Sequence, residues 1–165
     1  MISRRAVLVG ALASGCVKRV PAVEQFRTFM NDLPRAVAGR VPFEPWNLEG
    51  KVSLVTFIAT WCFPCLTELV VLQHLQRDYE ERGFRNVLVG MDLEGFEVLE
   101  PFATGYKLEM PLVIADDRIR AGETSWGRIR ELPSRVLFNR DGQIAVAYSG
   151  VATYESLDAV VKKLL

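Results

Sequence analysis

Two cysteines, Cys62 and Cys65, stand three residues apart between an apolar run and a helical pattern, and this arrangement constrains the fold most strongly. The run Val52–Ala59 is rich in β-branched and aromatic residues, which predicts a buried central strand. Apolar residues then recur between positions 66 and 79 at the spacing of a helix, and Gly83 marks its expected end. The cysteine pair is therefore expected at a strand-to-helix junction in an α/β fold.

The position of Cys62 at the start of this helix favours redox chemistry. Unpaired backbone N–H groups and the positive end of the helix dipole both stabilise a thiolate there. Because the thiolate is the attacking species in thiol–disulfide exchange, Cys62 is predicted to be the nucleophile. Cys65 lies one turn further into the helix and is expected to be more buried and to act as the resolving thiol. Pro64 fits the first turn, where it removes no intrahelical hydrogen bond.

A structural metal site or a permanent disulfide would also use a cysteine pair, but both fit this chain less well. A structural zinc site needs four ligands, whereas the chain contains 3 cysteines and 1 histidine. Cys16 belongs to the N-terminal segment, and His74 is interpreted as an ordinary residue further along the helix. A permanent disulfide across so short a loop would remove little unfolded-state entropy. A module that binds Cu(I) stays open as an alternative function, because two thiolates suit this soft ion, although no third ligand is evident.

The N-terminus has the order of a bacterial export signal. Residues 1–15 carry two arginines, then an apolar run, then small residues before Cys16. The apolar run is much shorter than the ~20 residues that a membrane-spanning helix needs. Residues 12–16 resemble a lipobox, in which the cysteine is acylated and becomes the first mature residue. We therefore predict a Sec or twin-arginine signal peptide over residues 1–15, lipid on Cys16, and a membrane-anchored location in the bacterial cell envelope or periplasm.

The remaining composition indicates one globular domain behind a short tether. Half of the residues are hydrophobic, enough to build a core without a web of disulfides. The 20 basic residues balance the 20 acidic ones, so no nucleic-acid partner is expected. Residues 16–40 are predicted to be a tether with a short helix, and residues 41–165 the domain. Further strands are expected at residues 86–91, 112–115, 135–139 and 143–149, and helices at residues 96–106 and 153–164.

Three features of the sequence resemble the TlpA/ResA type of membrane-anchored bacterial thiol–disulfide oxidoreductase. They are the motif Trp61-Cys62-Phe63-Pro64-Cys65, the glutamate Glu68 three residues later, and the pair Leu132-Pro133 before a late strand. The resemblance covers about residues 41–165. It implies a thioredoxin fold, in which a central mixed β-sheet is flanked by α-helices.

The resemblance also implies an activity and its partners. The protein is expected to reduce disulfides in client proteins through the Cys62/Cys65 pair, outside the cytoplasm, with no cofactor beyond that redox-active disulfide. An upstream membrane or periplasmic electron donor would restore the dithiol, and lipid on Cys16 would supply the contact with a membrane. An oxidising, disulfide-forming protein of the same fold remains an alternative, because the reducing direction rests on family analogy.

The resemblance assigns supporting roles around the two thiols. Pro133 is expected to follow a cis peptide bond and to lie against the disulfide, with the backbone of Leu132 free to pair with an extended substrate. Trp61 would shield the thiols, and Phe63 would favour apolar partners. Glu68 matches a carboxylate that tunes the thiols or assists proton transfer; a solvent-exposed glutamate on the helix surface is the alternative.

Two departures from the family pattern affect the surroundings of the thiols. Thr56 stands where thioredoxins carry a buried aspartate that takes part in proton transfer, so that role passes to Glu68 or to water, or is absent. Ser134 and Arg135 stand where two threonines are frequent, next to the presumed substrate groove. We expect thiol–disulfide exchange at Cys62 and Cys65 in spite of these departures. The departures are expected to affect the reduction potential and the choice of partner.

Overall fold

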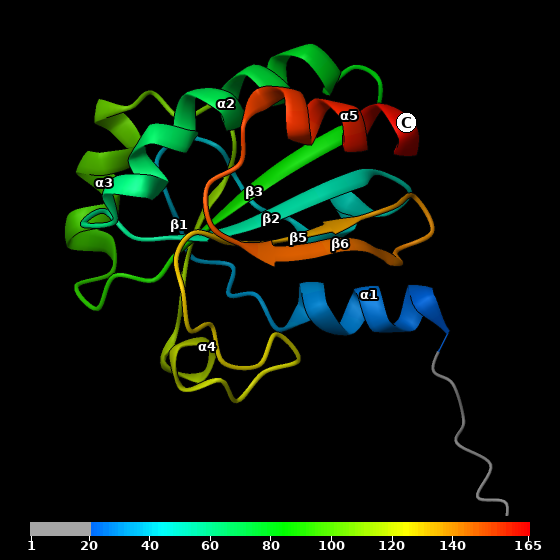
Figure 1. Ribbon diagram of the computed structural model, residues 1–165. Helices are drawn as coiled ribbons and strands as arrows, with labels where there is room; N and C mark the ends of the chain where they lie inside the picture. Colours follow the sequence, from blue (N-terminus) through cyan, green and yellow to red (C-terminus); the bar gives the residue numbers. More distant parts are fainter. Residues whose placement is uncertain (1–20) are drawn as a thin grey trace, which may run out of the picture.

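The apolar run before the two cysteines forms β2 (Val52–Ile58), a central strand of a six-stranded sheet whose seven residues are all buried. The computed structural model describes residues 21–165, which form one α/β unit (Figure 1). The predicted signal peptide, residues 1–15, and Cys16 lie outside the described residues. Each strand and helix named in the sequence predictions is found at its expected place, with ends that differ by a few residues.

Strands and helices alternate along the chain until the last two strands, which follow each other directly and lead into the last helix. The other strands are β1 (Val37–Ala38), β3 (Phe84–Gly90), β4 (Leu112–Ile114), β5 (Ser134–Phe138) and β6 (Ile144–Ser149). The helices are α1 (Ala22–Asn31), a 3-10 helix η1 (Pro45–Leu48), α2 (Phe63–Tyr79), α3 (Phe96–Gly105), α4 (Asp117–Ala121) and α5 (Tyr154–Leu164).

The strands lie in the order β1-β4-β3-β2-β5-β6 across the sheet. β2, β3 and β4 are parallel to one another, and β1, β5 and β6 run antiparallel to their neighbours. The predicted mixed sheet flanked by helices is therefore confirmed. Since β2 and β3 are the two innermost strands, the loop that follows β2 opens near the centre of the sheet edge. This loop leads into α2, which begins at the cysteine pair.

Side chains alternate between the two faces of the sheet and so divide the core in two. Leu54 and Ile58 of β2 pack with α2, α3 and α5 on one face. Val55 and Phe57 pack with α1, η1 and α4 on the other face. Figure 1 shows α2 and α5 above the sheet and α1 and α4 below it. This alternation determines which side chains of each strand can reach α2, the helix that carries the cysteines.

The described part of the predicted tether packs against the sheet. The expected short helix is α1, whose Phe26 ring lies 5.1 Å from the ring of Phe138. The indole N–H of Trp126 donates a 2.8 Å hydrogen bond to the carbonyl of Phe29. β1, which the sequence analysis did not predict, pairs with β4 as an edge strand. Residues 22–38 thus belong to the same packed unit as the rest, because α1 supplies aromatic side chains to the lower core.

Asp158 joins α5 to α2, and its substitution provides a test of that contact. Its carboxylate accepts hydrogen bonds from Lys162 Nζ, at 2.8 Å, and from the Tyr79 hydroxyl, and these hold the pKa of Asp158 below its usual value. A carboxylate with a lowered folded-state pKa stabilises the fold above the unfolded-state pKa, and this contribution is lost as pH falls through the folded-state pKa. We expect Asp158→Asn to lower the urea midpoint at neutral pH and to leave it unchanged in strong acid.

The control for this measurement is Asp141→Asn, at an exposed turn residue whose carboxylate makes no hydrogen bond within the described residues. Its urea midpoint should match that of the unmodified protein at both pH values. An Asp158→Asn deficit that is equally large in acid would mean that the carboxylate charge does not hold the two helices together.

Candidate active site

The two cysteines form a disulfide at the N-terminus of α2. Cys62 is the N-cap residue, and its Sγ accepts a 3.2 Å hydrogen bond from the backbone N–H of Cys65. Pro64 occupies the first turn, where no backbone N–H is needed. Cys62 is 5% exposed and Cys65 is 1% exposed, so Cys62 is the sulfur nearer to solvent, as the sequence predicts. The helix start therefore supplies N–H donors to the sulfur that would carry the thiolate.

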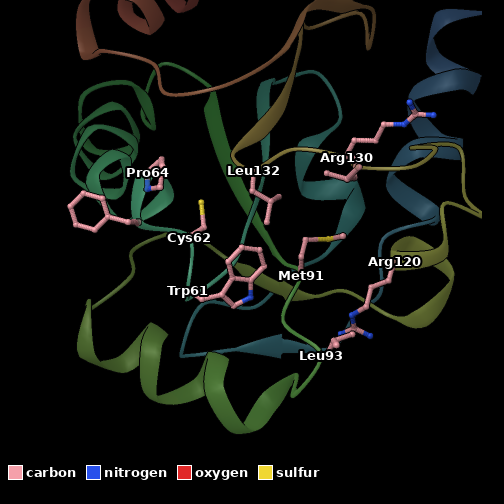
Figure 2. Close-up of a pocket in the computed structure, with 10 residues that line it drawn as sticks. Trp61, Cys62, Pro64, Met91, Leu93, Arg120, Arg130 and Leu132 are labelled. Carbon is pink, nitrogen blue, oxygen red and sulfur yellow. The ribbon is translucent and has the colours of Figure 1, made fainter.

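An apolar hollow of about 590 Å³ opens beside Cys62. Trp61, Met91 and Leu132 line it, together with Leu93 (Figure 2). Trp61 is 73% exposed and Leu93 is 81% exposed, so two large apolar side chains face solvent beside a reactive sulfur. Exposed apolar groups of this size are typical of a surface that binds a partner. The hollow therefore offers apolar area to a binding partner beside Cys62.

Phe63 and two arginines complete the surroundings of the hollow. Phe63 is 73% exposed between the two cysteines, where it can contact a partner. Arg120 is held in place, since it pairs with Asp117 at 3.1 Å and donates to the carbonyl of Asp92 at 2.7 Å. Arg130 is exposed at the side of the hollow away from Pro64 (Figure 2).

The loop before β5 carries the predicted cis peptide bond, between Leu132 and Pro133. Pro133 is buried, and its carbonyl accepts a 2.9 Å hydrogen bond from the backbone N–H of Gly150. Leu132 is part of the lining of the hollow. The expectation that the backbone of Leu132 pairs with an extended substrate stays a prediction, and the position of Leu132 beside Cys62 is compatible with it.

Asp92 fixes the loop that presents the cysteines, and sequence reasoning missed it. It is 1% exposed at the end of β3. Its carboxylate accepts the backbone N–H of Thr60 at 3.1 Å and the Thr60 hydroxyl at 2.5 Å. Because β3 is parallel to β2, the residues that follow the two strands meet at the same sheet edge. An acidic residue directly after a buried strand was the sequence signal that could have identified it.

Glu68 is fully buried, so its interpretation as a solvent-exposed helix residue is wrong. Its Oε1 lies 2.5 Å from Nη1 of Arg135, and its Oε2 accepts a 2.6 Å hydrogen bond from Nη2. Both side chains have no exposed area. Oε1 also accepts the backbone N–H of Ala152 at 3.2 Å. Burial raises the pKa of Glu68, and the Arg135 charge and these hydrogen bonds oppose that shift.

Arg135, which the sequence analysis placed next to the substrate groove, is instead buried against Glu68, a pairing that sequence reasoning did not predict. Its Nη2 also donates to the carbonyl of Gly150 at 2.7 Å, and its Nη1 donates to the hydroxyl of Tyr148 at 3.2 Å. The guanidinium lies 4.7 Å from the centre of the Tyr148 ring. The sequence signal was an arginine inside an apolar strand, two residues before buried Leu137 on the same face.

The structure divides the predicted site residues into two groups around the disulfide. Trp61, Phe63, Pro64 and Leu132 line the hollow with Cys62, where a partner can reach them. Glu68, Cys65 and Pro133 are buried and do not line the hollow. Cys16, the predicted lipid attachment residue, lies outside the described residues. The predicted site thus has an accessible part, which lines the hollow with Cys62, and a buried part, which contains Cys65 and the charged Glu68.

The described residues contain no cluster of three or more histidine, cysteine, aspartate or glutamate side chains placed to hold a metal ion. His74 is exposed on α2, in agreement with its interpretation as an ordinary helix residue. Within residues 21–165, no helix combines the length and apolar character needed to cross a membrane.

Comparison with known proteins links this site to a family. The Redoxin family model matches residues 17–163. The chain is 29% identical over 119 residues to thiol-disulfide oxidoreductase ResA of Bacillus cereus, which is 72% of this chain but 66% of the relative. The chain thus covers slightly less than two thirds of that protein's length.

Solved structures with the same fold include two at 25% sequence identity. One is a thiol:disulfide interchange protein of the thioredoxin family from Chlorobium tepidum, with a TM-score of 0.65 over 80% of this chain and 95% of that chain. Another is StoA from Bacillus subtilis, with a TM-score of 0.57 over 68% of this chain and 83% of that chain. The fold is therefore the thioredoxin fold, and the chain belongs to the Redoxin family, with the sequence features of its TlpA/ResA type.

Proposed function

We propose that this protein is an extracytoplasmic thiol–disulfide oxidoreductase that reduces disulfides in client proteins. The observation that carries the proposal is the Cys62–Cys65 disulfide at the N-terminus of α2, with the more accessible sulfur beside an apolar hollow. The disulfide is the oxidised state of the pair, which is the product of client reduction. The resemblance of the chain to proteins named thiol-disulfide oxidoreductase supports the same reaction class.

The first step begins from the reduced pair. The Cys62 thiolate attacks one sulfur of the client disulfide, so that a mixed disulfide forms and the other client sulfur leaves as a thiolate, which takes up a proton. The N–H groups at the start of α2 stabilise the Cys62 thiolate before the attack. Trp61, Leu93 and the other apolar residues of the hollow would hold the client segment against Cys62.

The second step closes the disulfide that the structure contains. Cys65 loses its proton and attacks Sγ of Cys62, which forms the Cys62–Cys65 bond and releases the second client sulfur as a thiolate. The second client thiolate takes up the proton that Cys65 released. Two electrons have then passed from the cysteine pair to the client, and the client holds two thiols. A dithiol donor must supply two electrons and two protons to regenerate the reduced pair.

Two sequence features support the direction and the location of this reaction. Pro64 lies in the active-site dipeptide as it does in reducing thioredoxins, and the overall motif resembles the TlpA/ResA type. The basic, apolar and small residues before Cys16 support export and lipid attachment. With a lipid on Cys16, residues 17–21 would connect the membrane surface to α1.

The reducing direction predicts a low reduction potential. In equilibrium with glutathione, the Cys62/Cys65 pair should have a potential near that of thioredoxin, about −270 mV, and the reduced protein should reduce insulin disulfides. The matched control is Cys62→Ser, which cannot form the intramolecular disulfide. A potential near the −120 mV typical of strong oxidants such as DsbA would show that the protein forms disulfides in its clients.

A further inference from the structure

The buried ion pair between Glu68 and Arg135 joins α2 to β5. Threonine is frequent at the place of Arg135, and thioredoxins carry a buried aspartate at the place of Thr56. In this protein Thr56 and Arg135 lie directly opposite each other on β2 and β5, and both are buried. The Thr56 hydroxyl and Nε of Arg135 make no hydrogen bond within the described residues. The polar group behind the disulfide is therefore an arginine–glutamate pair.

We propose that Arg135 is a positioning residue that keeps the Glu68 carboxylate in a fixed, charge-balanced pair behind Cys65, and that this balance sets the reduction potential of the disulfide. The proposal rests on the redox function proposed above. Arg135 and Glu68 touch neither the hollow nor a client, so they act through the thiols.

The geometry shows that the pair is held in one arrangement. Arg135 reaches both oxygens of Glu68, and three further groups hold the two side chains: the N–H of Ala152, the carbonyl of Gly150 and the hydroxyl of Tyr148. These contacts come from α2, β5 and β6 and from the segment that leads into α5. Neither side chain can therefore turn away from the other without losing several buried hydrogen bonds.

Fold stability alone is a weak reason for such a pair. The desolvation of two buried charges offsets much of their attraction, and apolar side chains of similar volume often stabilise a core equally well. Leu69 and Leu72 on the same helix are buried in this part of the core, next to Glu68 along the chain. A specific electrostatic role explains the presence of two charges at a position where leucine and methionine would pack.

The two charges are close enough to the thiols to influence them. Glu68 follows Cys65 by three residues on α2, and side chains with this spacing have Cβ atoms about 5–6 Å apart. At that distance, and away from water, an unbalanced cation stabilises a thiolate and an unbalanced carboxylate disfavours it. With both charges present, their effects on the reduced pair largely cancel. Of the titratable side chains, Tyr148 on β6 contacts the ion pair, and Cys65 precedes Glu68 by three residues on α2.

The test removes the charge of Glu68 and then the charges of both Glu68 and Arg135. For each variant, the thiol–disulfide exchange equilibrium of the Cys62/Cys65 pair with glutathione is measured. Glu68→Gln keeps the shape of the side chain and an acceptor for Ala152 but leaves the Arg135 charge unbalanced. Stabilisation of the reduced, thiolate form makes a disulfide more oxidising. We therefore expect the exchange equilibrium to shift about tenfold toward the dithiol, which raises the reduction potential by about 30 mV. The thiolate absorbance of the reduced variant should also appear at lower pH.

The double variant Glu68→Gln/Arg135→Met carries neither charge. Its exchange equilibrium should return to within about twofold of the unmodified protein. Glu81→Gln is the matched control, because Glu81 is exposed beyond the opposite end of α2 and its loss removes the same charge from the chain. This control should leave the equilibrium within about twofold of the unmodified protein.

Two results would overturn the role of Arg135. One is an exchange equilibrium of Glu68→Gln that stays within about twofold of the unmodified protein or moves in the opposite direction. The other is a double variant that keeps the full shift of the single one. An unmodified protein whose cysteines do not exchange with glutathione at all would contradict the proposed function itself, so the two failures are distinguishable.

Discussion

Cys62→Ser is expected to reduce insulin-disulfide reduction to the uncatalysed background, because the variant lacks the sulfur that attacks the client. Cys62 is the more exposed of the two sulfurs and lies at the helix N-terminus beside the hollow. Serine keeps the N-cap acceptor, so the start of α2 should be preserved. A hydroxyl at this place has no redox chemistry, and Cys65 is too buried to replace Cys62 as the nucleophile.

Cys65→Ser is expected to abolish turnover by a different route. In this variant Cys62 still attacks the client, but no second sulfur resolves the mixed disulfide, so the covalent complex accumulates. Non-reducing electrophoresis should show complexes that disappear on addition of a reductant, and mass spectrometry of these complexes would identify the clients. The control is Cys16→Ser, which changes the third cysteine and should keep full turnover in the purified protein. Complexes formed equally by Cys62→Ser would contradict the assignment of Cys62 as the attacking sulfur.

Arg135→Met is expected to have the largest effect on stability, a loss of about 3–5 kcal/mol in the free energy of unfolding. The substitution fills a similar volume but leaves the Glu68 carboxylate buried without its cation, and it removes the hydrogen bonds to Gly150 and Tyr148. Urea unfolding at neutral pH measures this loss. The loss of stability should be smaller in acid. In the unmodified protein Arg135 opposes protonation of Glu68, whereas in the variant Glu68 can take up a proton, which removes the unpaired charge.

Two variants provide controls for this loss of stability. Arg128→Met changes an arginine outside the ion pair and should alter the free energy of unfolding by less than about 0.5 kcal/mol. Glu68→Gln/Arg135→Met should be more stable than Arg135→Met alone, because it leaves no unpaired charge. A loss of less than about 1 kcal/mol for Arg135→Met would mean that Glu68 finds another partner or reaches water.

The disulfide thus separates two environments with different tasks. On one side the hollow beside Cys62, with Trp61 and Leu93 at its surface, offers apolar area to a client. On the other side Glu68 and Arg135 form a buried pair that no client can touch. Substitutions in the hollow should therefore change the choice of partner, while removal of one charge of the ion pair should change the reduction potential.

The strand, the cysteine motif and the helix were predictable from sequence because their signals are local. β2 is rich in β-branched and aromatic residues, α2 has helical spacing, and the thiolate site follows from the position of Cys62 at the helix start. The mixed sheet followed from the order of the elements and from the resemblance to a known family. β1 was not predictable, since two residues are too short for a periodic pattern, and the edge strand exists because β4 offers it a partner.

The sequence by itself determined that this protein carries a redox-active cysteine pair at a strand-to-helix junction, because helix polarity and side-chain period act over a few residues. Only the tertiary structure decided what surrounds that pair. Glu68 and Arg135 are separated by 67 residues and meet because β5 pairs with β2 in the register that turns Arg135 toward α2. Such pairing depends on strand order, on register and on the need of a buried carboxylate for a partner, and no local pattern specifies these.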